Sequence, residues 1–418
     1  MYQLDWIQRL RVLDKSPAAN SARQKPLGVS ANVWRLGFTS FFTDISSEMV
    51  SSILPLYFIS YLRFSPFQFG ILDGIYQGAA VALLSLFSGF AADRWRRQKE
   101  LASAGYGFSA LSRLVLLLAG GNWIFAAATL VMDRIGKGIR TAPRDAMISL
   151  SSRADNLATA FAVHRGLDAG GAVFGPLAAF LVLRLVPGGF SLVLAASFCI
   201  ALIGLGLIAL LVEKPALSAN TRPPALSLSL GLWKHPPFRV LLICGALLSL
   251  TTVSDSFLYL SLQRSTNAPS TMFPLFAFVT AVSFLIFSVP MGRLADRWGR
   301  KKVFLAGNGL LLFIYAILLS PGLGTRAPFA ILGLLGAYYA ATDGIMAAMG
   351  SAVLKPELRT SGLAILNTAI SVFRFFSSFV FGLLWTDGSS RPPIAVFLAG
   401  VTVAIIVANW NLTRKETL

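Results

Sequence analysis

The sequence predicts an all-α, polytopic membrane protein whose twelve transmembrane helices form two pseudo-symmetric six-helix bundles. Of its 418 residues, 55% are hydrophobic and only 13% are charged, and the mean hydropathy is +0.69. A soluble domain carries about 25% charged residues, and a disordered chain is rich in charge and poor in apolar residues. Long apolar runs and an internal repeat of charged motifs support the same fold class.

Each predicted helix is a run of about 20 mostly apolar residues, the length that crosses a bilayer core of roughly 30 Å. Several runs contain glycine or proline, which membrane helices tolerate, and none shows the strict alternation of a β-barrel strand. The twelve runs are residues 34–62, 67–91, 101–119, 122–148, 158–186, 190–212, 239–263, 272–291, 303–320, 327–350, 361–385 and 393–411.

The remaining segments are tails and connections. Residues 1–33 lack the apolar core of a secretory signal and are predicted to be a cytoplasmic tail, as are residues 412–418. The proline- and serine-rich segment 213–238 is the predicted cytoplasmic linker between an N-terminal bundle, 34–212, and a C-terminal bundle, 239–411. With the termini inside, 26 of the 36 lysines and arginines fall on the inner side and 5 on the outer. Cytoplasmic loops carry such an excess, so we expect an inner (plasma) membrane protein with both termini cytoplasmic.

Several classes of function are disfavoured. The net charge of +18 is spread between apolar runs rather than over a soluble face, so we expect no nucleic-acid partner. Two cysteines, Cys199 and Cys244, and two histidines supply neither a disulfide framework nor the usual zinc site. The patterns GxxxxGK(S/T), GxSxG and HExxH are absent. We therefore expect no cofactor, no metal and no enzyme activity.

An internal repeat divides the chain. GFAADRWRRQK at residues 89–99 matches GRLADRWGRKK at residues 292–302, which places Asp93 and Asp296 203 residues apart. Two other pairs of intramembrane aspartates recur at offsets of 211 and 210 residues. Two halves of equivalent topology follow, and repeats of this kind place a substrate site near the midplane, at the interface between the halves.

The two repeated loops resemble the signature loop of the major facilitator superfamily, GxLaDRxGRrk, which follows the second and the eighth helix. The resemblance covers the whole chain, although the first copy has Phe90 for leucine and Arg96 for glycine. In that family the loop gates the cytoplasmic side; a basic loop that only fixes topology is the alternative. The resemblance implies gating roles for Asp93, Arg94, Gly292, Asp296 and Arg297.

The fourth and fifth runs resemble motifs of proton-coupled exporters in this superfamily. Arg134 begins a match to RxxxGxxxA, and the resemblance implies that it interacts with the coupling proton site. Gly171, Gly175 and Pro176 are similar to the antiporter motif gxxxGPxxGG, although the final glycine pair is absent. Ordinary close packing of small residues is the alternative for the fifth run.

Ionisable residues within the runs are the candidate site. An ionised side chain near the midplane costs about 2.5–3.5 kcal/mol, so Arg134 should face a partner or a wet cavity. Asp44 and Glu48 share one helix face, and burial and mutual repulsion favour their protonated forms. Asp44, Glu48 and Arg134 are therefore the predicted proton-coupling residues; a charge pair with Arg134 or Arg165 that fixes the bundle is the alternative. The predicted substrate path comprises Lys137, Arg165, Asp255, Asp133 and Asp343.

The sequence thus predicts a secondary transporter that works by alternating access and exports a small organic compound in exchange for protons. Its partners would be that compound, protons and the lipid bilayer, and the resemblance implies a monomer. Export or symport of an anionic metabolite or siderophore is the alternative within transport. A non-transporting membrane sensor, or a membrane enzyme using Asp44, Glu48 and His164, is the alternative outside it.

Overall fold

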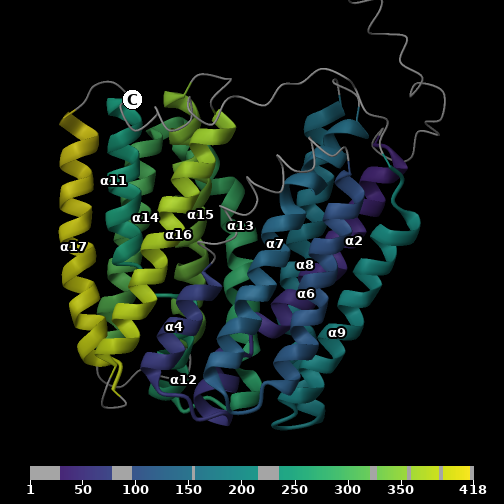
Figure 1. Cartoon of the computed structure of the whole chain (residues 1–418). Helices are drawn as coiled ribbons and strands as arrows, with labels where there is room; N and C mark the ends of the chain where they lie inside the picture. Colours follow the sequence, from purple (N-terminus) through teal and green to yellow (C-terminus); the bar gives the residue numbers. More distant parts are fainter. Residues whose placement is uncertain are drawn as a thin grey trace, which may run out of the picture.

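The computed structural model describes residues 29–77, 97–152, 156–214, 235–320, 327–354, 359–385 and 389–414. Every regular element within these ranges is a helix, and the helices overlap all twelve predicted runs. Figure 1 shows two bundles side by side, the N-terminal half in purple to teal and the C-terminal half in green to yellow. The predicted fold class, an all-α polytopic membrane protein, is confirmed.

The N-terminal half begins with an interrupted run. Helix α2 ends at Ser51, and the chain becomes helical again at Leu54, with Pro55 in the first turn, where the missing N–H group is tolerated. The elements of this half are α2 (Ala31–Ser51), α3 (Leu54–Leu56), the π-helical turn η3 (Tyr57–Tyr61), α4 (Pro66–Tyr76), α6 (Gln98–Leu118), α7 (Trp123–Leu150), α8 (Leu157–Leu185), α9 (Phe190–Gly206) and the π-helical turn η5 (Leu207–Leu211).

The C-terminal half departs from the prediction in its first run, 239–263, which is two helices. The hydroxyl of Tyr315 bridges the break: it accepts a hydrogen bond from the N–H of Val253 at 2.7 Å and donates one to the carbonyl of Thr251 at 3.2 Å. Ser254 then caps the second helix. The elements are α11 (Pro236–Leu250), α12 (Asp255–Thr266), the 3₁₀ turn η7 (Ser270–Met272), α13 (Pro274–Trp298), α14 (Arg300–Leu319), α15 (Ala327–Val353), α16 (Arg359–Leu384) and α17 (Arg391–Arg414).

The loop expected between the eighth and ninth helices is largely helical, which corrects the sequence analysis. Gly292, Asp296 and Arg297 all lie on α13, whose sequence has no breaker before Gly299. Gly299 adopts φ +97°, a conformation suited to glycine. The chain turns there and α14 begins at the next residue.

Nine of the described helical segments are long and apolar enough to cross a membrane. The other three predicted runs correspond to α2 with α3, to α4, which is described only as far as Gln77, and to α7. Helix α7 carries six charged residues between Asp133 and Asp145. Four of the six, Asp133, Arg134, Arg140 and Arg144, are at most 8% exposed. Most of the charges that lower the hydropathy of α7 therefore lie inside the protein.

The two halves meet at the end of the molecule opposite the start of α2 and the end of α17 (Figure 1). There α4 packs against α16 with backbone contact. A Cβ atom at Gly70 would lie 2.7 Å from the carbonyl oxygen of Ser378, and one at Gly382 would lie 2.6 Å from that of Pro66. The ring centroids of Phe67 and Phe379 are 5.5 Å apart across the same contact. We call this the closed end.

Candidate functional site

A cavity of about 460 Å³ lies between the two halves, within the usual size range of ligand pockets, about 300–1,000 Å³. Helices α2, α4 and α8 line it from one half, and α12, α13, α15 and α16 from the other. The charged side chains that line the cavity are Glu48, Asp73, Asp255, Asp343 and Arg374. Carboxylates thus outnumber cations on the cavity wall.

The C-terminal half contributes two predicted substrate-path residues to this wall. Asp255, in the first turn of α12, accepts a hydrogen bond from the hydroxyl of Tyr339 at 2.5 Å. Asp343 on α15 pairs with Arg374 on α16 at 3.3 Å. The charge of Asp343 is therefore balanced within the half, whereas the hydrogen-bond partner of Asp255 is a neutral phenol.

Helix α8 packs tightly against α2 at the two predicted proton-coupling carboxylates. A Cβ atom at Gly171 would lie 2.9 Å from the Cβ of Asp44, and one at Gly175 would lie 2.6 Å from the Cβ of Glu48. Glu48 lines the cavity and accepts a hydrogen bond from the Ser51 hydroxyl at 2.6 Å. The glycines of the antiporter-like motif therefore fix the two carboxylates against α8.

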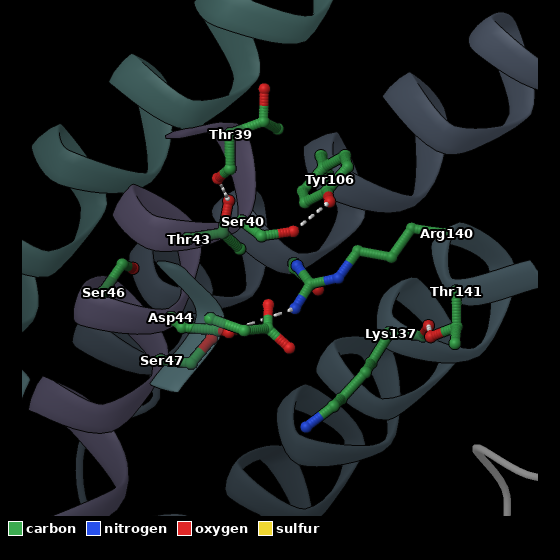
Figure 2. A network of polar contacts seen from close by, with 12 residues as sticks. Thr39, Ser40, Thr43, Asp44, Ser46, Ser47, Tyr106, Lys137, Arg140 and Thr141 are labelled. Atoms are coloured by element: carbon green, nitrogen blue, oxygen red, sulfur yellow. Dashed lines mark hydrogen bonds and ion pairs between the residues drawn. The ribbon is translucent and has the colours of Figure 1, made fainter. Parts of the chain in front are cut away.

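Asp44 faces both a carboxyl group and a cation. Its carboxyl group lies close to that of Asp168 on α8, and two carboxyl groups in such a position can share a hydrogen bond when one of them carries a proton. Figure 2 shows Arg140 of α7 directed at Asp44, with a separation of 3.9 Å. Lys137, one turn earlier on α7, has no hydrogen bond or ion pair from its ammonium group to any residue that the structure describes. The carboxyl pair of Asp44 and Asp168 is thus a proton-holding site beside cationic groups.

Asp168 also belongs to a polar network between α2, α7 and α8. It lies 3.9 Å from Arg144, which pairs more closely with Asp145 at 3.0 Å. The exposed Arg165 lies 3.8 Å from Asp168 along its own helix, as the sequence spacing suggests. His164 is fully buried, and its Nε2 lies 2.9 Å from the hydroxyl of Ser40.

Asp133, which the sequence analysis placed in the substrate path, lies in a buried charge cluster and not on the cavity wall. Arg113 of α6 donates to one of its carboxylate oxygens at 2.9 Å, and Arg134 pairs with the other. Arg113 also donates to the hydroxyl of Ser47 at 2.7 Å. The guanidinium of Arg134 lies 3.9 Å from the ring centroid of Tyr76, which lines the cavity. Asp133 is therefore the shared counter-ion of two buried arginines.

The predicted gating residues lie far from this network, at the end of α13. Asp296 is exposed and pairs with Arg300 at 3.7 Å. Arg300 and Lys301 donate to carbonyl groups of Ala348 on α15 and Leu412 on α17, near helix C-termini, where positive charge is favourable. Gly292 faces open space and Arg297 is exposed. Asp93 and Arg94 lie outside the described residues.

The structure thus brings Glu48, Asp255 and Asp343 to one cavity and places Asp44, Lys137 and Arg140 together beside α2. It also contains two functional candidates that the sequence analysis did not single out. One is Arg113, whose contact with Asp133 depends on the packing of α6 against α7. The other is Asp73, a lone carboxylate between Gly70 and Gly74 in GILDGIY.

The Gly175→Ala variant should be less stable than the native protein by about 1–3 kcal/mol, because the added methyl group would overlap α2 at Glu48. Thermal unfolding of the purified protein in detergent measures this. Gly166→Ala is the matched control: it lies on the same helix, is exposed and has no atom within 4 Å of an added Cβ. It should be neutral, or more stable by up to about 1 kcal/mol through helix propensity. Equal effects of the two variants would contradict the close-packing role.

Comparisons with known proteins agree on one family. The sequence profile of the Major Facilitator Superfamily matches residues 36–282 and 241–417. An uncharacterized MFS-type transporter of Methanocaldococcus jannaschii is 28% identical over 405 residues, which cover 95% of this chain and 97% of that protein.

Solved transporter structures share the fold. The nucleoside transporter NupG superimposes with a TM-score of 0.73 at 17% identity, covering 92% of this chain and 98% of that one. A peptide transporter, POT, superimposes with a TM-score of 0.78 at 12% identity, covering 95% and 96%. At these identities the likeness concerns the fold alone.

Proposed function

This chain belongs to the Major Facilitator Superfamily and is a membrane transporter, and we propose that it exports a small organic compound by alternating access in exchange for protons. The observation that carries the proton coupling is the close pair of carboxyl groups of Asp44 and Asp168, flanked by Arg140 and Arg144. This pair lies next to the cavity-lining Glu48, one turn further along α2. A proton held there and a substrate in the cavity can therefore influence each other.

The coupling follows from the charges around the pair. With one proton, the two carboxyl groups attract each other through a hydrogen bond. Without the proton, the two neighbouring carboxylates repel each other. Arg140 and Arg144, each 3.9 Å from one of them, then offer alternative partners. Loss of the proton therefore favours a different packing of α2 against α7 and α8, and helices that rearrange in this way can shift the balance between two conformations.

The cavity wall favours a substrate with a positive charge. Hydroxyl groups donate hydrogen bonds to the carboxylates of Glu48, Asp73 and Asp255, so no cation among the described residues neutralises these three. Arg374, the one cation that lines the described cavity, is paired with Asp343. Tyr76, Tyr259 and Tyr339 line the same cavity, and aromatic rings suit a cation with an apolar body. The second candidate is an anionic metabolite. The ammonium of Lys137, which has no ion-pair partner among the described residues, favours it, and Lys137 and Arg165 would then line its path along α7 and α8.

The proposed setting is the inner membrane, with both termini cytoplasmic and the protein acting as a monomer. In that orientation the closed end lies outside and the cavity faces the cytoplasm. The α13 residues Gly292, Asp296 and Arg297, together with Asp93 and Arg94, would then control closure on the cytoplasmic side.

Purified protein in proteoliposomes with an internal pH dye provides the test. Pools of organic cations, anions and chelates are added under a proton gradient. We expect a pool of cations to move protons, and we expect the Asp44→Asn/Glu48→Gln double variant to abolish that movement. The sign of the signal distinguishes antiport from symport.

Glu100→Gln is the matched control, because Glu100 pairs with Lys214 on an exposed surface away from the cavity. Proton movement that persists in the double variant would refute the assigned residues. If no pool moves protons while a ligand still binds, proton coupling is refuted. The next hypotheses to test are then sodium coupling, uniport and a non-transporting membrane sensor.

A further inference from the structure

Asp73 on α4 is a buried carboxylate at the closed end, only 4% exposed. Its Oδ2 accepts a hydrogen bond from the hydroxyl of Ser378 on α16 at 2.7 Å. Ser254 and Ser256, at the start of α12, line the same cavity as this carboxyl group. Asp73 belongs to the N-terminal half, whereas all three serines belong to the C-terminal half.

The helices on both sides of Asp73 are in direct contact. Gly70 lies against the backbone of Ser378 and Gly382, and a Cβ atom at Gly74 would lie 2.8 Å from the ring of Phe375. Any side chain at either glycine would hold α4 away from α16. The two glycines therefore bring Asp73 close enough to reach a donor on the opposite half.

A hydrogen bond across the interface stands in place of an ion pair. In the described part of the chain, Asp73 has no lysine or arginine partner, and its side chain accepts its hydrogen bond from Ser378 of the other half. A neutral hydroxyl group and the nearby N-terminal end of α12, where a helix carries partial positive charge, thus stabilise a buried carboxyl group. Separating the halves at this end would remove that donor.

We propose that Asp73 is the latch of the closed end: its hydrogen bond to Ser378 holds the halves together and breaks each time that end opens. Asp73 acts in this way as a positioning residue, and this role is separate from its place on the cavity wall. The inference rests on the alternating access of the proposed function, but it holds whatever the substrate and whether or not transport is coupled to protons.

Distances between spin labels test the latch without any substrate. The labels are attached to cysteines introduced at Arg184, in the last turn of α8, and Arg391, at the start of α17, in a background carrying Cys199→Ala and Cys244→Ala. Both label sites are exposed and lie on opposite halves. We expect two label-to-label distances, a shorter one when this end is closed and a longer one when it is open. Asp73→Ala should raise the population of the longer distance relative to that of the shorter one by about tenfold. Asp73→Asn keeps an acceptor oxygen and should have a smaller effect.

Ser378→Ala removes a donor from the opposite half and should shift the distances in the same direction. Its effect should be less than additive with that of Asp73→Ala, since both variants break the same contact. Ser261→Ala is the matched control, because this buried hydroxyl on α12 donates to the carbonyl of Phe257 within its own helix. Unchanged distances in Ser378→Ala, or fully additive effects, would overturn the latch even if Asp73→Ala fails to fold. Neither result would bear on the proton-coupling proposal.

Discussion

The Asp133→Ala variant should lose about 3–5 kcal/mol of stability, the usual result of leaving a buried charge without its partner. Asp133 is the anion between Arg113 and Arg134, whose side chains are 3% and 7% exposed. Without it, two guanidinium groups would face each other in the interior. The measurement is thermal unfolding of purified protein in detergent, together with the yield of monodisperse protein from membranes.

Asp296→Ala is the control, because it also removes the charge of a paired aspartate, but one that is exposed instead of buried. The Asp296 side chain is 72% exposed, and its pair with Arg300 spans the short turn between α13 and α14. Exposed pairs of this kind contribute about 0–1 kcal/mol. If Asp133→Ala unfolded at the same temperature as Asp296→Ala, the cluster would not stabilise the N-terminal half.

The bilayer makes most of this fold predictable from sequence, because a spanning helix must be long, apolar and internally hydrogen-bonded. Helix α7 is the informative exception. Its six charged residues lower its hydropathy, and four of the six are buried inside the protein. The break between α11 and α12 carries no proline in the residues 251–254. It is held by Tyr315 on α14, a tertiary contact that no local pattern reveals.

The site is predictable only as far as it follows from spacing along one helix. The i, i+4 spacing puts Asp44 and Glu48 on one face, and the i, i+3 spacing pairs Arg165 with Asp168. The contact of Asp168 with Asp44 depends instead on how closely α8 approaches α2, which Gly171 allows. The contact of Asp133 with Arg113 likewise joins two helices, so spacing along α7 does not reveal it.

The Asp168→Asn variant should lose gradient-driven accumulation of substrate while it still exchanges substrate down its own gradient. An amide can donate a hydrogen bond to an ionised Asp44, and Arg140 remains 3.9 Å away. Asp44 would then need no shared proton, and proton binding would no longer be linked to the packing of α2. The measurement compares accumulation under a pH gradient with counterflow in the absence of a gradient, both in proteoliposomes.

Asp145→Asn is the matched control for Asp168→Asn, because both substitutions take one carboxylate from Arg144. Of the two, only Asp168 also lies close to the carboxyl group of Asp44. Accumulation should therefore survive in Asp145→Asn, and counterflow should survive in both variants. If both variants lost accumulation equally, the charge balance of Arg144 would be the coupling element, and the carboxyl pair would not. If Asp168→Asn accumulated substrate normally, proton coupling would have to lie outside the pair, and Glu48 would be the remaining carboxylate on α2 able to supply it.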